Sequence, residues 1–339
     1  MITHETSLKE FDQQLDYSLD NYTNHGLKSS NFQNVVMGGL GGSGIGASMA
    51  KSWFFDKSAL PIETINDYNL PAYVNAQTLV ILNSYSGNTE ETISLFEEAL
   101  DKDASIVCLA SGGKIQAMAE ANNVVCYPIK LGFQPRQTLG IGLTYLVLIL
   151  GDFFDSDYSA ELQEIKSKLI ENQAKQIASA ERIFGYFASS LKNKFVILAD
   201  RAMLPVATRF AQQLNENAKL EAFVHPVPEC NHNVLESYTD RLPTNFLLLH
   251  TEENLSVGSR FDFIAGHLEM DNNRVLPLAI PNYDLYTIYD VNYRLDWFSV
   301  LAGNELDADL MNVPILTSLK EFMNEVEIIQ APEGEEEED

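Results

Sequence analysis

Three hydroxyl-bearing residues follow an apolar run in the first third of the chain. Ser84, Ser86 and Thr89 come directly after residues 78–82, whose sequence TLVIL predicts a buried parallel strand. Gly87 lies among them and lets the backbone approach a ligand closely. Hydroxyl groups beside the free N–H groups of a following helix can bind a phosphate dianion, so the pattern predicts a phosphate site. The same residues would also suit an ordinary N-capped helix after a strand.

A glycine-rich segment follows an earlier predicted strand. Residues 38–46 read GGLGGSGIG, in which Gly42 and Ser43 can offer a backbone N–H group and a hydroxyl to an anion. The same glycines fit the fingerprint of a dinucleotide-binding loop, with Glu63 as the acid that would bind the ribose. This loop alone therefore does not separate a sugar phosphate from a nicotinamide cofactor. The second loop, at residues 84–89, favours the sugar phosphate, because a dinucleotide site has no use for it.

Together the two segments resemble a sugar isomerase (SIS) domain, through GGSGIG at residues 41–46 and SYSGNTEET at residues 84–92. Matches further along narrow the resemblance to the bifunctional phosphoglucose/phosphomannose isomerase family, over residues 30 to 325 or thereabouts. The resemblance implies that glucose 6-phosphate and mannose 6-phosphate interconvert with fructose 6-phosphate through a cis-enediolate. It implies no metal and no other cofactor.

For two of the matching residues the resemblance implies roles in proton transfer and charge stabilisation. Arg136, in QPRQTLG, is implied to stabilise the enediolate, although a solvated surface arginine is the ordinary alternative. Glu216, in NENAK, lies in the last turn of a helix predicted to start at Pro205. The resemblance implies that Glu216 is the catalytic base, and pairing with Lys219 at i+3 is the alternative.

Two more matching residues would open the sugar ring. His232, in PECNHN, is implied to move a proton to the ring oxygen, and in the wider superfamily this histidine comes from the neighbouring subunit. The resemblance therefore implies a homodimer with shared active sites. Lys320 is implied to assist from a helix predicted over 313–325, where a surface lysine at the edge of a buried apolar stripe is the alternative. A zinc site made of His225, Glu229 and His232 is a weaker interpretation, since the segment has neither a pair of histidines at helical spacing nor a cluster of cysteines.

The pattern of alternating strands and helices predicts an α/β fold with two doubly wound parallel-sheet domains of SIS type, which is flavodoxin-like. The domains are expected at 1–153 and 154–331, followed by an acidic tail at 332–339. Strands are predicted at 34–37, 61–65, 78–82, 105–109, 123–127, 194–199, 220–224, 245–250 and 274–279. Ligands of such sheets bind beyond the carboxyl ends of the strands, where both loops lie. Residues 1–20 predict one amphipathic helix.

Composition limits the partners. The net charge of −26 over 339 residues argues against nucleic acid and against an anionic membrane surface. The cysteines are Cys108, Cys126 and Cys230, and their spacing suits neither a disulfide framework nor zinc. The most apolar stretch, 139–150, is too short to span a bilayer, so a cytoplasmic protein is expected.

Two other classes of function share these features. A non-catalytic sugar-phosphate sensor on the same fold would bind fructose 6-phosphate without turning it over, and a dehydrogenase would bind a nicotinamide cofactor on the glycine loop. The joint presence of Glu216, His232 and Lys320 favours the isomerase. Residues 307–313 depart from the Asp-Pro-x-Pro run of the family and are expected to influence acceptance of the mannose epimer.

Overall fold

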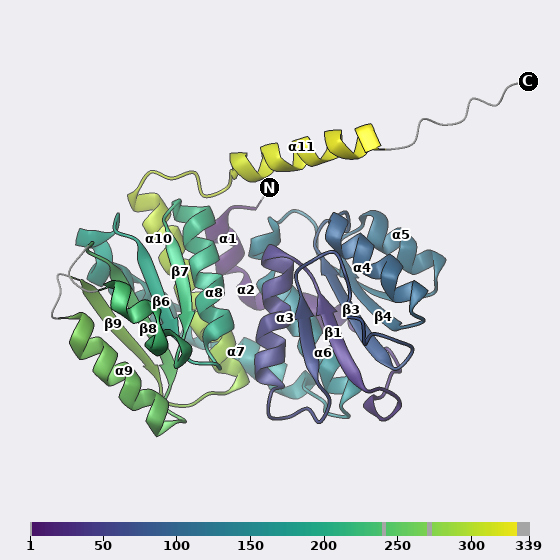
Figure 1. Cartoon of the computed structure of the whole chain (residues 1–339), viewed down its shortest axis with the longest axis horizontal. Helices are drawn as coiled ribbons and strands as arrows, with labels where there is room; N and C mark the ends of the chain where they lie inside the picture. The colour runs from purple at the N-terminus through teal and green to yellow at the C-terminus, as the bar shows by residue number, and fades with distance from the viewer. Residues whose placement is uncertain (1, 239–241, 270–272, 331–339) are drawn as a thin grey trace, which may run out of the picture.

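The computed structural model describes residues 2–238, 242–269 and 273–330, whose strands form two parallel sheets (Figure 1). The first sheet has the order β2-β1-β3-β4-β5 and the second has the order β7-β6-β8-β9. The strands are β1 (Asn34–Gly38), β2 (Ile62–Ile65), β3 (Thr78–Ser84), β4 (Ser105–Ala110), β5 (Val125–Pro128), β6 (Phe195–Ala199), β7 (Ala222–Pro226), β8 (Asn245–Thr251) and β9 (Arg274–Ile280). Each predicted strand is confirmed, with ends that move by one or two residues.

The helices cover both faces of each sheet. They are α1 (His4–Lys9), α2 (Phe11–Asn21), α3 (Gly41–Trp53), α4 (Glu90–Asp101), α5 (Gly113–Ala121), α6 (Leu139–Phe153), α7 (Ser159–Phe187), α8 (Leu204–Gln213), α9 (Leu255–Leu268), α10 (Leu285–Glu305) and α11 (Pro314–Gln330). Helices α4 and α5 pack on one face of the first sheet, and α9 packs on one face of the second. The central strands β3, β6 and β8 are buried along their whole length, which explains their continuous apolar sequences.

One apolar core joins the remaining faces of the two sheets. It runs from Leu8 in α1 to Ala302 in α10 and includes α3, α6, α7 and α8. The long helix α7 packs against both α2 and α10 and so connects the two halves of the chain. Phe298 of α10 lies at the centre of an aromatic cluster with Phe187, Phe195 and Phe210. The predicted domain boundary at residue 153 coincides with the end of α6 and stays a prediction.

Helices α3 and α8 pack side by side and run in opposite directions. The hydroxyl of Ser52, at the end of α3, donates to the carbonyl of Ala202, just before α8 begins. Each helix starts at the carboxyl end of its own sheet. The carboxyl edge of the first sheet, where α3 begins, therefore lies beside the amino edge of the second sheet, where α8 ends.

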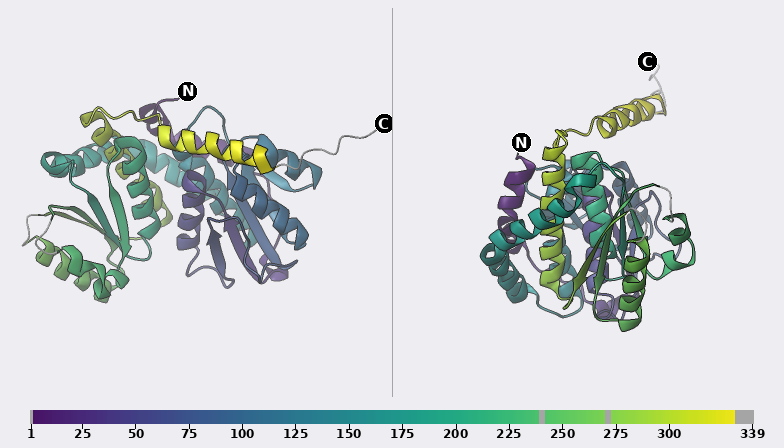
Figure 2. Two further views of the ribbon diagram at one scale, coloured as in Figure 1. Left: turned by 45° about the horizontal axis from the view of Figure 1, so that its top comes forward. Right: turned by 90° about the vertical axis from the view of Figure 1, so that its left-hand side faces the viewer.

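The two ends of the chain differ from expectation. The first twenty residues form two helices, because the backbone turns at Glu10 (φ −103°, ψ 21°) between α1 and α2. The buried stripe predicted on the last helix is wrong within one chain: its members Leu316 and Leu319 are 45% and 54% exposed. Helix α11 stands away from both sheets (Figures 1 and 2). The acidic tail lies outside the described residues, and within them no helix is long and apolar enough to cross a membrane.

Candidate active site

The loop after β3 is organised by its own hydroxyl groups. Ser84 is buried, accepts a hydrogen bond from the Gly87 N–H at 3.1 Å, and lies 2.8 Å from the hydroxyl of Thr89. Thr89 is the N-cap residue of α4, yet its side chain makes no capping bond. The ordinary side-chain cap that the sequence also allowed is therefore not formed, and the first N–H groups of α4 face the loop without it.

Two further hydroxyl groups line the same edge of the sheet. Ser86 is exposed and accepts from the Asn88 N–H at 3.2 Å. Ser43, in the first turn of α3, accepts from the Tyr85 N–H at 3.1 Å. Because each oxygen is already an acceptor, the O–H group of each serine can point at a ligand oxygen.

The glycine loop comes into close contact with the segment that carries Arg136. A Cβ atom on Gly42 would lie 2.9 Å from the backbone N and Cα of Arg136. Such an atom on Gly44 would lie 2.3 Å from the carbonyl oxygen of Gly39, which closes the loop on itself. Gly42 is thus a packing position for Arg136 as well as an expected anion ligand. Glu63, the acid expected for a ribose in the dinucleotide alternative, accepts a hydrogen bond from Tyr73.

Arg136 is buried, with only 4% of its surface exposed, in a short 3-10 helix (Pro135–Gln137). Its Nη1 lies 3.2 Å from Oε2 of Glu216, and its Nε donates to Oδ1 of Asn217 at 3.0 Å. Its Nη2 donates to the carbonyl oxygens of Leu310 and Met311 at 2.8 and 3.2 Å. Burial lowers the pKa of the guanidinium, and the charge of Glu216 opposes this shift. The surface alternative for this arginine is therefore wrong.

Glu216 lies in a π-helix (Leu214–Ala218) that continues α8. A π-turn widens the helix and re-aims its side chains, and it places Glu216 toward Arg136, with 27% of the glutamate side chain exposed. The alternative ion pair with Lys219 is not formed. The Lys219 ammonium donates to the carbonyl oxygens of Glu216 and Asn312 instead.

His232 and Glu216 lie at opposite ends of the second sheet. Glu216 precedes β7, whereas His232 follows it in a short 3-10 helix (Glu229–His232). β7 has five residues and is about 16 Å long at roughly 3.3 Å per residue. Lys320 is exposed on α11. The fold of one chain thus brings Arg136 and Glu216 together but brings neither His232 nor Lys320 to them.

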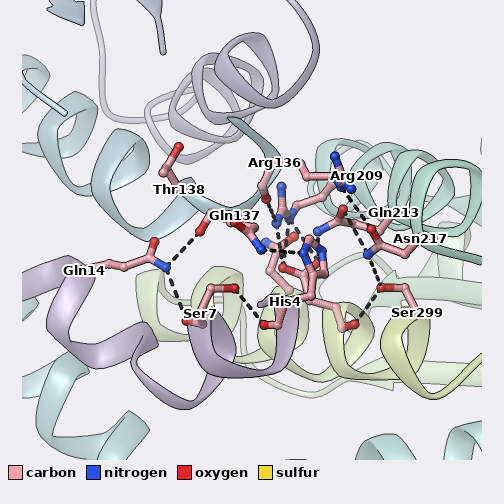
Figure 3. A network of polar contacts seen from close by, with 12 residues as sticks. His4, Ser7, Gln14, Arg136, Gln137, Thr138, Arg209, Gln213, Asn217 and Ser299 are labelled. Atoms are coloured by element: carbon pink, nitrogen blue, oxygen red, sulfur yellow. Dashed lines mark hydrogen bonds and ion pairs between the residues drawn. The ribbon is translucent and has the colours of Figure 1, made fainter. Parts of the chain in front are cut away.

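Behind Arg136 lies a buried polar network that the sequence analysis did not find (Figure 3). Arg209 of α8 forms a buried ion pair with Asp296 of α10 at 2.6 Å, and its Nη2 also donates to the carbonyl oxygen of Arg136 at 2.8 Å. His4 of α1 lies 2.9 Å from the side chain of Gln137. A signal for this network was available, because Arg209 falls on the same helical face as the buried Val206 and Phe210, where a charge needs a partner.

The zinc alternative has no geometric support within the described residues. There, no three His, Cys, Asp or Glu side chains are close enough together to hold a metal ion. His225 lies 3.0 Å from the hydroxyl of Tyr238.

Comparison with known proteins identifies the family. A sequence from Aquifex aeolicus named bifunctional phosphoglucose/phosphomannose isomerase is 32% identical over 86% of this chain and 90% of its own length. One of the same name from Caldicellulosiruptor bescii is 34% identical over 88% of this chain and 92% of its own length. The chain belongs to the bifunctional phosphoglucose/phosphomannose isomerase family.

A family model, a relative with a different name and a solved structure also match this chain. Residues 170–323 match the family model of the bacterial phospho-glucose isomerase C-terminal SIS domain. A relative from Sulfolobus acidocaldarius named D-glucosamine-6-phosphate 4-epimerase is 32% identical over 66% of this chain and 69% of its own. The C-terminal domain of glucosamine-fructose-6-phosphate aminotransferase from Francisella tularensis superposes with a TM-score of 0.72, over 91% of this chain and 97% of its own, at 14% identity. That structure confirms the SIS-type fold.

Substitution of Gly42 tests the contact between the glycine loop and Arg136. We expect Gly42→Ala to lower the free energy of unfolding by about 1–3 kcal/mol, because its methyl group would press on backbone atoms that cannot yield cheaply. Gly46→Ala, one turn further along α3, is the matched control, since its Cβ would lie 3.5 Å from Leu146 Cδ1. Urea unfolding measures both. Equal free energies for the two variants would contradict the close approach.

The pH dependence of stability tests whether the pKa of the buried His4 is lowered in the folded chain. Burial, with help from the charges of Arg136 and Arg209, lowers the pKa of His4 to about 3. Between pH 6 and pH 4 the unfolded chain protonates this histidine and the folded chain does not, so stability falls as the pH falls, by up to about 1.4 kcal/mol per pH unit. His4→Asn keeps an acceptor for Gln137 but does not titrate. We therefore expect the wild type to lose stability relative to His4→Asn over this range in urea unfolding. A constant difference would show that His4 is protonated in the fold.

Proposed function

We propose that this chain interconverts glucose 6-phosphate and mannose 6-phosphate with fructose 6-phosphate, with Glu216 as the base. Family membership supports the reaction, and the contacts of Arg136 support the site. Through Gly42, the backbone of Arg136 packs against the loop expected to hold the phosphate. Its guanidinium meets Glu216, which comes from the other half of the chain. The phosphate end and the reacting carbons of one substrate can therefore be held between the two sheets.

The phosphate ligands follow from the hydroxyl groups at the carboxyl edge of the first sheet. Ser43 and Ser86 each have an O–H group free to donate. The pair of Ser84 and Thr89 uses one O–H group in its mutual bond, which leaves the other for the ligand. With the N–H groups at Gly42 and at the start of α4, these donors fix the phosphate and so orient the reacting carbons.

The chemistry needs one carboxylate and one fixed cation. Glu216 removes the proton from C2 and returns it to C1, and the guanidinium of Arg136 stabilises the negative charge that develops on the enediolate oxygen. The configuration at C2 is lost in the enediolate. One base can therefore serve both epimers if the pocket accepts either orientation about the C2–C3 bond. Residues 307–313 are expected to influence which orientations the pocket accepts.

We propose that a second copy of the chain supplies His232. Within one chain His232 and Glu216 are separated by the length of β7, and His232 is exposed. A homodimer in which the carboxyl edge of one second sheet meets the amino edge of the other brings them together. Lys320 assists ring opening once α11 is seated, since the exposed apolar side chains of Leu319 and Phe322 require a covering surface.

We propose a cytoplasmic location. Cys108 and Cys126 are neighbours on adjacent strands and remain free thiols, as does Cys230. Free cysteines in such positions suit a reducing compartment.

The first experiment measures fructose 6-phosphate formation from glucose 6-phosphate and from mannose 6-phosphate with a chelator present. We expect turnover of both, and we expect Glu216→Gln to lower kcat by at least ~10²-fold because the general base is lost. Glu221→Gln, which changes an exposed glutamate nearby, is the matched control and should keep full activity. Binding of fructose 6-phosphate without turnover would instead support the sensor. Activity of Glu216→Gln would remove the base from this residue.

Mixing two inactive variants tests the shared site. Glu216→Gln and His232→Asn should each be nearly inactive alone. Co-expression should restore activity, because each mixed dimer contains one site with an intact glutamate from one chain and an intact histidine from the other. Each variant co-expressed with itself is the control. If His232 acts within its own chain, mixing restores nothing.

A further inference from the structure

A line of buried polar side chains connects α10 to Arg136, and Asn217 is its central member (Figure 3). Asn217 follows Glu216 in the π-helix and has no exposed surface. Its Oδ1 accepts from Nε of Arg136 at 3.0 Å, and its Nδ2 donates to the hydroxyl of Ser299 at 2.9 Å. The residue that follows the proposed base thus holds the proposed enediolate-stabilising cation.

The chemistry of its neighbours fixes the orientation of the Asn217 amide. Ser299 donates its O–H group to the carbonyl oxygen of Asp296 at 2.7 Å, and a carbonyl oxygen can only accept. The Ser299 oxygen must therefore accept from the NH₂ side of Asn217, which turns the carbonyl side of the amide toward Arg136. Nε of Arg136 can only donate, so it matches this orientation and no other.

This orientation determines which part of the guanidinium faces Glu216. Nε is held by Asn217, and Nη2 is held by the carbonyl oxygens of Leu310 and Met311. The remaining nitrogen, Nη1, is the one that lies 3.2 Å from Glu216. Because the guanidinium is planar, fixing Nε and Nη2 also fixes the direction in which Nη1 points.

The backbone of Arg136 is held by a different set of contacts. Arg209, paired with Asp296, donates to the carbonyl oxygen of Arg136, and Gly42 packs against its N and Cα atoms. Loss of Asn217 should therefore leave the backbone of Arg136 and the adjacent glycine loop in place. It should free only Nε, so that the guanidinium can turn about its remaining contacts.

We propose that Asn217 is a positioning residue that aims the guanidinium of Arg136 at the reacting oxygen beside Glu216, and that Ser299 fixes the direction of Asn217. The proposal rests on the roles proposed above for Arg136 and Glu216. It predicts a defect in the chemical step with normal binding of the phosphate group, because the phosphate loop does not depend on Asn217.

The test compares Asn217→Leu, which keeps the branched shape and the number of side-chain heavy atoms but removes the side-chain hydrogen bonds, with Asn292→Leu. Asn292 is an equally buried asparagine on α10 that bonds to the carbonyl oxygen of Ile288 and does not contact Arg136. We expect Asn217→Leu to lower kcat by about 10²-fold, as a misaimed catalytic group does, while Asn292→Leu keeps the wild-type kcat. The KM for glucose 6-phosphate and the inhibition constant of inorganic phosphate should stay within about twofold, because uniform binding is unchanged.

A transition-state analogue provides a second readout. A five-carbon aldonic acid phosphate has a carboxylate where the enediolate carries its charge, so its affinity should fall in Asn217→Leu by the same factor as kcat/KM. Ser299→Ala removes one hydroxyl and allows the amide to turn over. We expect it to show a smaller loss of the same kind, which keeps the test valid if Asn217→Leu fails to fold.

The outcomes separate this proposal from the proposed function. Wild-type kcat in Asn217→Leu and Ser299→Ala, with Glu216→Gln inactive, would overturn the positioning role alone. So would a loss of kcat accompanied by an equal loss of phosphate affinity, which a merely structural role would produce. Full activity of Glu216→Gln would instead overturn the proposed base, whatever the Asn217 variants do.

Discussion

The buried guanidinium of Arg136 is the contact on which the rest of the site depends. The guanidinium contacts Glu216 and Asn217 from the second half of the chain and two carbonyl oxygens of the segment before α11. The backbone of the same residue packs against Gly42, which belongs to the first sheet's glycine loop. A buried charge must satisfy all its donors or destabilise the fold, so the segments that surround it are held in one arrangement. The same requirement that stabilises the contact aligns the proposed base with the proposed phosphate loop.

The core behind Arg136 contains a second buried charge and its partner. Arg209 and Asp296 form a fully buried ion pair, which a well-packed apolar pair could replace without loss of stability. Here the pair has a further contact, since Arg209 also holds the backbone of Arg136. Removal of either partner alone would leave an unpaired charge in the core and cost about 3–5 kcal/mol. These contacts connect the buried ion pair to the backbone of Arg136 and so to the proposed site.

The opposed directions of α3 and α8 explain why one chain does not bring His232 to Glu216. They place the carboxyl edge of the first sheet beside the amino edge of the second, so Glu216 reaches Arg136 while His232 lies at the opposite end of β7. Helix α11 also has exposed apolar side chains, which require a covering surface. A second copy meets both needs in the arrangement proposed here.

The sequence by itself determined the two parallel sheets and the two loops at the carboxyl edge of the first, because buried parallel strands and glycine or hydroxyl turns are local patterns. It also named Arg136 and Glu216, through a resemblance rather than through any local signal. Only the tertiary structure decided that these two residues touch and that Asn217 holds Arg136. It also decided that His232 and Lys320 lie in other parts of the fold. The π-turn at Glu216, the break at Glu10 and the uncovered side of α11 were equally hidden. Each depends on partners distant in sequence, and periodicity along the chain does not record which distant groups a side chain will meet.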